Sequence, residues 1–311
     1  MKIAIMGTGG VGGYFGGLLA RGGHQVTFIA RSAHLAAIQQ YGLMVESQLD
    51  GDFTAQGNAT GDPASAGIQD LVLLAVKMYH NVQAIPALLP MAGPNTVVMT
   101  LQNGIDNGDQ LVQALGRERV MIGSVYMEGR VKEPGVVTQR GPGTAFFGEL
   151  DLGITRRGKD LLKVFQGAGW RVELAENMTG MLWKKFAYIA GSAAVNAATN
   201  TDYEEMRSTP ATRELIRGAI DEGLAVGRAM GAPVMDDSLD WAMTSLDKFP
   251  AAGRASLAKD FQAGNPVELE GLTGTVIRLG KQAGVPTPLN DAIYAILKPW
   301  ALRIESSLAK D

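Results

Sequence analysis

An apolar strand, a glycine-rich turn and a helix follow one another at the start of the chain, and this order restricts the fold more than any other feature. Residues 3–6 have the pattern of a strand and residues 11–21 that of a helix. The turn between them fits G-x-G-x-x-G, and its residues are Gly7, Thr8, Gly9, Gly10, Val11 and Gly12. A turn of this kind in this context predicts a dinucleotide-binding site at the start of a parallel sheet.

Each glycine of the pattern stands where a side chain would hinder the turn, the ligand or the packing of the helix. Gly7 permits the tight turn, Gly9 lets the backbone approach a pyrophosphate, and Gly12 lets the helix lie close to the strand. The N-terminus of the helix offers free N–H groups and a partial positive charge to that pyrophosphate. A glycine-rich turn without a ligand is the alternative, which the strand before the turn and the helix after it disfavour.

The end of the second predicted strand, residues 26–29, indicates which dinucleotide binds. A site for NAD(H) carries a carboxylate here, which accepts a hydrogen bond from the 2′-hydroxyl of the ribose. This chain has Arg31 followed by Ser32, and a guanidinium suits a 2′-phosphate. We therefore expect NADP(H); an Arg31 that begins a helix and faces water is the alternative.

Composition excludes several other kinds of site. The 28 Lys and Arg against 31 Asp and Glu give a formal net charge of −3, so we expect no nucleic-acid and no membrane partner. The chain has no cysteine, and its three histidines, His24, His34 and His80, lack a metal-binding spacing, so we expect no metal site. The strand-like first residues leave no room for a signal peptide, which predicts a cytoplasmic protein.

The order of the predicted elements gives a fold class and two domains. Strands alternate with helices through the first half, which predicts an α/β fold with a doubly wound sheet of the Rossmann type. Extended segments between residues 120 and 147 predict antiparallel additions to this sheet. Strand signals then fade, and we predict an NADPH-binding domain at 1–175 and an all-helical substrate domain at 176–311. The strands predicted in the first half are 3–6, 26–29, 71–76 and 96–100.

Two polar residues follow predicted strands at the edge where an open α/β sheet binds its ligands. Lys77 comes after the strand at 71–76, and Asn103 comes after the strand at 96–100. Each has an ordinary alternative, since a lysine at a strand end is often solvated and Asn-Gly is a common turn. Position alone therefore makes them candidates for the ligand site.

The helical half contains two neighbouring lysines near the start of a long uncharged segment. Helical spacing separates them, because Lys184 and Lys185 project from different faces. Lys185 begins a partly polar stripe and could point into a cleft between the domains, although a solvated lysine is the commoner case. The other members of its stripe are Ile189, Ser192, Ala193 and Asn196.

Ser256 and Glu268 lie further along the helical half. The segment 266–270 is predicted to open a helix, which places Glu268 and Glu270 in its first turn. Carboxylates are favoured there by the helix dipole alone, so their position does not by itself indicate a function.

Taken together, the motifs resemble the ketopantoate reductase (2-dehydropantoate 2-reductase) family over nearly the whole chain. Each piece is weak alone, but their order and spacing are specific. The matching pieces are 7–17, Arg31, 76–77, 102–104, 183–186, Ser256 with Asp260, 267–270 and 286–290. Members of this family join an N-terminal NADPH-binding Rossmann domain to a C-terminal helical domain, which agrees with the division above.

The resemblance implies an NADP-dependent oxidoreductase that reduces 2-dehydropantoate to pantoate in pantothenate and coenzyme A biosynthesis. It implies that Lys185 is the general acid that protonates the substrate oxygen. It also implies that Asn103 and Glu268 contact both cofactor and substrate, that Ser256 binds the carboxylate end of the substrate, and that Lys77 belongs to the cofactor-binding cleft.

The chain departs from the family pattern at two positions. Well-known members carry asparagines four and eight residues after the catalytic lysine, where this chain has Ile189 and Ala193. A more apolar pocket holds a hydroxylated substrate less well. A reductase of another branched 2-oxo acid is therefore an alternative, unless Ser192 and Asn196 compensate.

A non-catalytic regulator that senses NADPH is the alternative from another class. A sensor needs neither Lys185 nor Glu268, so the presence of both favours the enzyme. The small-molecule partner expected here is a 2-oxo acid. The sequence leaves the oligomeric state open, with a homodimer among the options.

Overall fold

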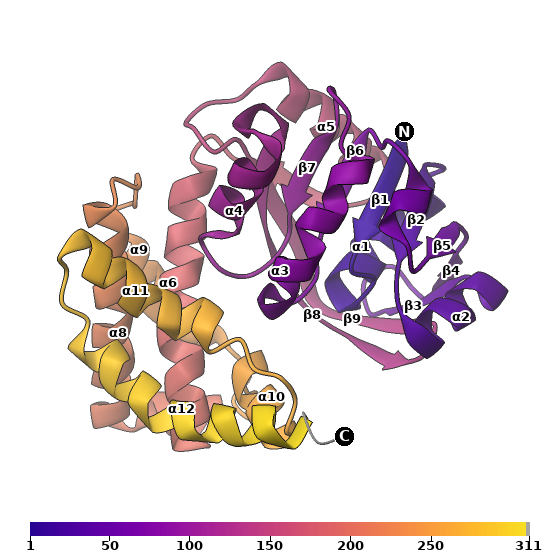
Figure 1. Ribbon diagram of the computed structural model, residues 1–311. Helices are drawn as coiled ribbons and strands as arrows, with labels where there is room; N and C mark the ends of the chain where they lie inside the picture. Colours follow the sequence, from indigo (N-terminus) through magenta and orange to yellow (C-terminus); the bar gives the residue numbers. More distant parts are fainter. Residues whose placement is uncertain (309–311) are drawn as a thin grey trace. The chain divides into compact units, whose positions relative to one another are not determined.

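The computed structural model describes residues 1–308, and the chain divides into two compact units (Figure 1). The first unit is Met1–Met178, and the second begins at Thr179. The first unit is built around one sheet and the second is helical, which confirms the predicted fold class.

The first unit contains a ten-stranded sheet with the order β4-β3-β9-β8-β7-β6-β1-β2-β5, and β10 pairs with β9. The central strands β7, β6, β1 and β2 are all parallel, so their carboxyl ends lie at one edge of the sheet. The strands are β1 (Lys2–Met6), β2 (Gln25–Ile29), β3 (Leu43–Ser47), β4 (Phe53–Ala55), β5 (Asn58–Thr60), β6 (Leu71–Leu74), β7 (Val97–Thr100), β8 (Val120–Glu133), β9 (Val136–Gly148) and β10 (Arg171–Leu174).

Helices connect the strands of this sheet, and most crossovers are short. The α-helices are α1 (Gly10–Arg21), α2 (Ser32–Tyr41), α3 (Asn81–Ala84), α4 (Asn107–Leu115) and α5 (Arg156–Gly167). Single 3₁₀ segments complete the connections, namely η1 (Pro63–Ala66), η2 (Met78–His80), η3 (Pro86–Met91) and η4 (Arg117–Arg119).

The alternation of side chains along the central strands supplies a core on each face of the sheet. In β1, Ile3 and Ile5 join the cluster that contains Phe15 of α1. Ala4 and Met6 join the opposite cluster, which contains η3 and α4 side chains. Because both faces are covered, the strands are apolar throughout, as expected for a buried parallel sheet.

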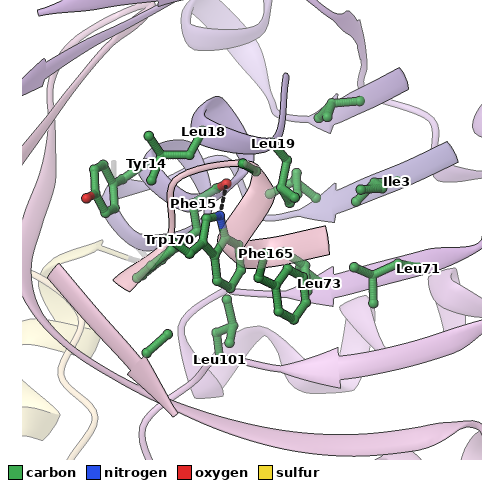
Figure 2. Close-up of a cluster of buried hydrophobic side chains, with 14 of the residues drawn as sticks. Ile3, Tyr14, Phe15, Leu18, Leu19, Leu71, Leu73, Leu101, Phe165 and Trp170 are labelled. Atoms are coloured by element: carbon green, nitrogen blue, oxygen red, sulfur yellow. Dashed lines mark hydrogen bonds between the residues drawn. The ribbon is translucent and has the colours of Figure 1, made fainter. Parts of the chain in front are cut away.

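Helices α1 and α5 are joined by an aromatic contact over one face of the sheet (Figure 2). Phe165 and Trp170 stack with ring centroids 4.3 Å apart and an angle of 6° between their planes. The indole Nε1 of Trp170 donates a hydrogen bond of 3.0 Å to the carbonyl oxygen of Phe15. The polar end of this large buried ring is therefore satisfied, and the ring fixes the course of α1.

The structure confirms the parallel strands and the antiparallel β8–β9 pair, and it adds strands that sequence patterns did not reveal. β3 has five residues and β4 and β5 have three each, and none of these strands was predicted. β6 ends at Leu74 instead of residue 76, and the carbonyl of Val76 accepts a hydrogen bond from the Gln102 side chain. Strand pairing thus stops where a side chain takes over the backbone acceptor.

The second unit is formed by α6 (Met178–Thr199, whose first residue closes the first unit), α7 (Tyr203–Ser208), α8 (Pro210–Ala229), α9 (Ser238–Lys248), α10 (Ser256–Ala263), the π-helix η5 (Glu270–Gly274), α11 (Thr275–Ala283) and α12 (Pro288–Leu308). The long uncharged segment that follows Lys184 and Lys185 forms the greater part of α6. The prediction that Glu268 lies in the first turn of a helix is wrong. The helix begins at Glu270, and the Glu268 carbonyl accepts the hydrogen bond of Leu272 N–H from just outside it.

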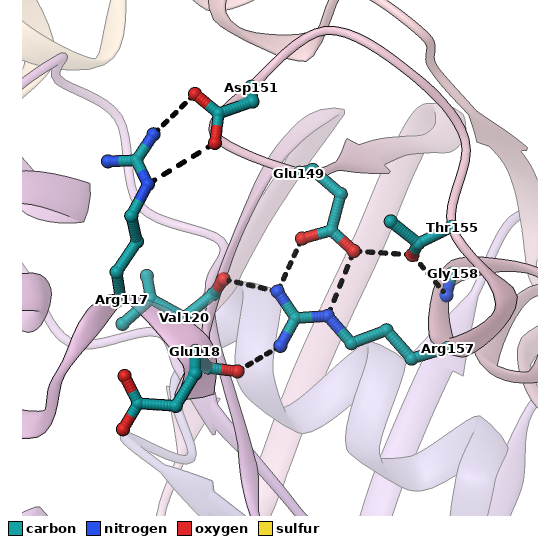
Figure 3. Close-up of polar contacts among 8 residues, drawn as sticks. All are labelled: Arg117, Glu118, Val120, Glu149, Asp151, Thr155, Arg157 and Gly158. Atoms are coloured by element: carbon teal, nitrogen blue, oxygen red, sulfur yellow. Dashed lines mark hydrogen bonds and ion pairs between the residues drawn. The ribbon is translucent and has the colours of Figure 1, made fainter.

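A half-buried ion pair between Arg157 and Glu149 joins α5 to the residue that follows β9 (Figure 3). The guanidinium of Arg157 donates to both carboxylate oxygens of Glu149 and to the backbone carbonyls of Glu118 and Val120. Burial alone raises the pKa of Glu149, but hydrogen bonds from Arg157 and Thr155 outweigh it and hold this pKa below its ordinary value. The pair therefore ties α5 to the start of β8 and favours the charged carboxylate.

We expect Glu149→Gln to lower the free energy of unfolding at pH 7 by about 1–3 kcal/mol, because Arg157 loses a charged acceptor. A carboxylate with a lowered folded-state pKa stabilises the fold above its unfolded-state pKa, and this stabilisation is lost as the pH falls through the folded-state value. The difference between variant and parent should therefore shrink in acid. Urea unfolding at pH 7 and at pH 3.5 measures both values.

Asp151→Asn is the matched control, because the Arg117–Asp151 pair lies on the same loop but is largely exposed. Such a pair contributes at most about 1 kcal/mol. Equal losses in the two variants would contradict the structural role given to Arg157.

Candidate functional site

The glycine-rich turn places α1 directly against β1. Gly7 has a φ of +101°, and a Cβ there would lie 2.8 Å from the backbone nitrogen of Val76. A Cβ on Gly12 would lie 2.1 Å from the carbonyl oxygen of Gly7. Neither position tolerates a side chain, so both glycines are required by close backbone packing.

The middle of the turn is open. A Cβ on Gly9 would meet no atom within 4 Å, unlike one on Gly7 or Gly12. Gly9 is the N-cap of α1, and within the described chain no side chain caps the helix and no acid lies in its first turn. The helix therefore presents uncapped N–H groups beside open space, which fits the phosphates of a dinucleotide.

Gly10 and Thr8 have structural contacts of their own. A Cβ on Gly10 would lie 2.1 Å from the backbone of Gly129, so β8 passes directly over the start of the helix. The hydroxyl of Thr8 is buried and donates a 3.0 Å hydrogen bond to the carbonyl oxygen of Ile29. Thr8 thus holds the turn to the end of β2, while Val11 is half-buried in the first turn of α1.

His34 braces the same turn from α2, and sequence reasoning considered it only as a metal ligand. Its Nδ1 accepts a hydrogen bond of 2.9 Å from the N–H of Gly135. Nδ1 is therefore unprotonated, so Nε2 carries the proton and donates to the carbonyl oxygen of Thr8 at 2.8 Å. A neutral imidazole thus connects the β8–β9 turn, the glycine turn and α2.

Arg31 lies at the end of β2, where the 2′-phosphate was expected. It is exposed and is the N-cap of α2, and the next residue, Ser32, has a φ of +50°. Burial lowers the pKa of His80, and the positive charge of Arg31 lowers it further. Arg31 is therefore close to the segment that follows β6, on the edge of the sheet that holds the glycine turn.

Lys77 and Asn103 lie on the same edge as the turn. Lys77 is exposed and precedes η2, and Asn103 is half-exposed after β7. A Cβ on Gly104 would lie 2.4 Å from the Sδ of Met78, so the two loops touch. The first unit thus brings together four of the predicted positions: the glycine turn, Arg31, Lys77 and Asn103.

In the second unit, the two neighbouring lysines of α6 have different surroundings, as the helical spacing predicts. Lys184 is half-buried, with its Nζ 5.0 Å from the centre of the Trp241 ring. Lys185 is 7% exposed. Burial lowers the pKa of Lys185 to about 7. An amine with such a pKa can give up a proton near neutral pH, as a general acid must.

Two hydrogen bonds connect the helix of Lys185 to the segments that hold the other predicted residues. The Oδ1 of Asn196 accepts a 2.9 Å hydrogen bond from Ala255 N–H, directly before the exposed Ser256 that begins α10. The hydroxyl of Thr273 in η5 donates to the carbonyl oxygen of Ala190 at 3.3 Å, close to the buried Glu268.

The two polar residues expected to compensate for Ile189 and Ala193 are used by the fold. The hydroxyl of Ser192 donates to the carbonyl oxygen of Tyr188 at 2.6 Å. The Nδ2 of Asn196 donates to the carbonyl oxygen of Thr201 at 2.9 Å, and its Oδ1 serves Ala255. Both side chains therefore contribute hydrogen bonds to the fold, and the compensation proposed from the sequence stays a hypothesis.

In residues 1–308 no helix is long and apolar enough to cross a bilayer. Over the same residues no three His, Cys, Asp or Glu side chains gather as a metal site would need.

Comparison with known proteins assigns both halves of the chain to the same family. The family model described as "Ketopantoate reductase PanE/ApbA" matches residues 3–151, and "Ketopantoate reductase PanE/ApbA C terminal" matches 177–301. The 2-dehydropantoate 2-reductase of Nostoc sp. is 30% identical, in an alignment covering 96% of this chain and 94% of the relative.

Solved structures agree in fold over the full length. A PanE/ApbA family ketopantoate reductase from Ralstonia eutropha is 33% identical with a TM-score of 0.90, covering 98% of this chain and 100% of the other. A 2-dehydropantoate 2-reductase from Methylococcus capsulatus is 27% identical with a TM-score of 0.89, covering 98% of each chain. With matches on both units and over nearly every residue, this chain belongs to the ketopantoate reductase family.

Proposed function

We propose that this protein is an NADPH-dependent 2-oxo-acid reductase that converts 2-dehydropantoate to pantoate on the route to pantothenate and coenzyme A. The observation that carries the proposal is the burial of Lys185, which lowers its pKa to about 7 in a member of a reductase family. The regulator that only senses NADPH is disfavoured, because a buried amine is costly to keep without chemistry that needs it.

The cofactor proposed is NADP(H). The uncapped start of α1 and the open space at Gly9 suit its pyrophosphate, and Arg31 suits its 2′-phosphate. When bound, the reduced nicotinamide supplies the hydride. The exposed guanidinium of Arg31 would form charge-assisted hydrogen bonds with a dianion there, which a ribose hydroxyl cannot match.

Lys185 is proposed as the general acid. As C2 of a 2-oxo acid is reduced, negative charge develops on the carbonyl oxygen. The ammonium of Lys185 would stabilise this charge and then donate its proton to the oxygen. Burial makes the amine a better proton donor at neutral pH than a solvated lysine.

The remaining candidates are proposed as binding groups. Asn103 would contact the nicotinamide and the substrate, with Lys77 beside it in the cofactor site. Ser256 would bind the carboxylate end of the substrate, and Glu268 would contact both cofactor and substrate. Support comes from the placement of Asn103 and Lys77 on the edge of the glycine turn, and from the ties of the other two segments to α6.

A second candidate is a reductase of a branched 2-oxo acid that lacks the hydroxyl of 2-dehydropantoate. Ile189 and Ala193 favour it, because they offer no polar group where well-known relatives have asparagines. Ser192 and Asn196 already form hydrogen bonds within the fold, so they have less capacity to bind a substrate hydroxyl. A pocket that cannot pair with a substrate hydroxyl discriminates weakly in its favour.

Oxidation of NADPH, followed by absorbance, separates the two candidates when 2-dehydropantoate is compared with trimethylpyruvate, which differs from it only by lacking the hydroxyl. We expect turnover of a 2-oxo acid in either case. A kcat/KM for 2-dehydropantoate at least about tenfold above that for trimethylpyruvate supports the first candidate, because one well-placed polar contact contributes about 1.4 kcal/mol. No oxidation with any branched 2-oxo acid would refute both.

Lys185→Ala should lower kcat by about 10²- to 10⁴-fold, the usual contribution of a general acid. Lys184→Ala is the matched control, because this neighbour lies against Trp241 and has no place in the proposed mechanism. Steady-state rates and circular dichroism of both variants check the expectation. A Lys185→Ala enzyme with parental kcat would rule out the assigned acid.

The pH dependence follows from the lowered pKa of Lys185. The acid acts as the ammonium, which predominates below a pKa of about 7. We therefore expect kcat/KM to be level below neutral pH and to fall about tenfold per pH unit above it. Profiles from pH 5.5 to 9.5 test this, and a level profile up to pH 9 would contradict the lowered pKa.

Arg31→Ala should reduce the preference for NADPH over NADH by about 10- to 100-fold, chiefly through a higher KM for NADPH. Arg156→Ala serves as a control, because that arginine is exposed and pairs only with Asp160 at 3.8 Å among the described residues. The ratio of kcat/KM for the two cofactors is the measurement. An unchanged ratio in Arg31→Ala would exclude the 2′-phosphate assignment.

A further inference from the structure

A buried chain of side-chain amides lies under the two loops that hold Lys77 and Asn103. Its members are Gln102, Asn81 and Asn107, which are 6%, 5% and 2% exposed. We infer that these three side chains are positioning residues, which hold the Asn103 loop and the Lys77 loop in one fixed arrangement for the nicotinamide end of the cofactor. The inference rests on the proposed function for its ligand.

The chain begins at Gln102, at the end of β7. Its Nε2 donates to the carbonyl oxygen of Val76 at 2.8 Å, directly before Lys77. The same Nε2 donates to the Oδ1 of Asn81 at 2.7 Å. The hydroxyl of Thr100 donates to the Oε1 of Gln102 at 3.1 Å, which fixes the orientation of the amide.

Asn81 connects Gln102 to two residues of α4. Its Nδ2 donates to the Oδ1 of Asn107 at 2.8 Å and to the Oε1 of Gln110 at 3.1 Å. The Nδ2 of Asn107 then donates to the carbonyl oxygen of Asn103 at 2.7 Å. The chain of amides thus begins on one loop and ends on the other.

The directions of these hydrogen bonds fix the orientation of each amide group. Each amide accepts through its oxygen and donates through its nitrogen, and the oxygen of Gln102 accepts from the Thr100 hydroxyl. Reversing one amide therefore breaks bonds on both sides. Buried amides that lose a partner are costly, which makes the arrangement cooperative. The backbone carbonyls of Val76 and Asn103 are consequently held as a pair.

Gly104 packs closely against both Met78 and the amide of Asn107. It has a φ of +102°, and a Cβ there would lie 2.4 Å from Met78 Sδ and 3.0 Å from Asn107 Nδ2. A side chain would push the amide of Asn107 away from the Asn103 carbonyl. The close approach of the loops therefore depends on glycine at this position.

The contacts suit a positioning role better than a binding one. Each of the three amide nitrogens donates within the protein, and the three side chains lie below the surface. Asn103 is half-exposed and follows this scaffold directly. A displacement of about 1 Å at a reacting group can lower a rate by about 10²-fold, so control of this loop has a large effect.

Asn107→Ala is the central variant, because it removes the hydrogen bond to the Asn103 carbonyl. We expect NADPH to bind about tenfold more weakly, by calorimetry, through loss of the placement of Asn103. The affinity for 2′-phospho-ADP-ribose, which lacks the nicotinamide, should change by less than about twofold. Hydride transfer in single turnover should fall by about 10²-fold, with little change in the KM of the 2-oxo acid.

Gln110→Ala is the matched control, because it removes another hydrogen bond of Asn81 without touching either loop carbonyl. It should retain the parental affinity for both ligands. A double-mutant cycle then tests the route: in an Asn103→Ala background, Asn107→Ala should change NADPH affinity by less than about twofold, because the group that it positions is gone.

Equal weakening of NADPH and 2′-phospho-ADP-ribose by Asn107→Ala, or additive effects in the cycle, would overturn the inference. If Asn107→Ala does not fold, Asn107→Asp at pH 8 gives the same test, since it keeps the acceptor for Asn81 and loses the donor. The two proposals fail differently. A parent enzyme that binds NADPH but reduces no 2-oxo acid refutes the proposed function, while the ratio of the two affinities still decides the role of the amide chain.

Discussion

The backbone of α1 lies against the turn that follows β1 with no side chain between them. A Cβ on Gly12 would stand 2.1 Å from the Gly7 carbonyl oxygen, and one on Gly7 would stand 2.8 Å from the Val76 nitrogen. This contact sets the height of α1 above the sheet, and so the direction in which its free N–H groups point. The rest of the first unit maintains it: Trp170 holds the carbonyl of Phe15, and His34 holds that of Thr8.

At the carboxyl ends of its parallel strands, the first unit therefore presents mainly backbone groups, and its buried polar side chains hold them in place. Thr8 uses its hydroxyl on Ile29, and Gln102, Asn81 and Asn107 use their amides on each other and on loop carbonyls. Such buried bonds are individually modest, but an unpaired member would cost more than a bond contributes. The loops are consequently fixed by polar contacts that no apolar core could direct so specifically.

Several of these features follow from the sequence, and their limits are physical. The glycine turn, the parallel strands and the different surroundings of Lys184 and Lys185 come from local periodicity, which depends only on neighbours along the chain. β4 and β5 have only three residues each, and in β3 the exposed Met44 hides the alternation of the buried Leu43 and Val45. The brace formed by His34 with Gly135 joins residues 101 positions apart, and Asn81 meets Asn107 across 26, so their partners exist only in three dimensions. Ser192 and Asn196 are a further example. Their spacing along the chain predicts that they share one face of a helix, but it does not show that they donate hydrogen bonds to backbone carbonyls.

The two units differ in the kind of positive charge that they present. The difference determines which of the proposed steps, anion binding or proton donation, should depend on pH. The uncapped N–H groups of α1 carry partial charges that do not titrate. Lys185 is different, because its burial brings the pKa of the amine to about 7. Anion binding by the first unit should thus vary little across neutral pH, whereas proton donation from α6 should vary steeply. A reaction that used both, as proposed above, would follow the titration of Lys185.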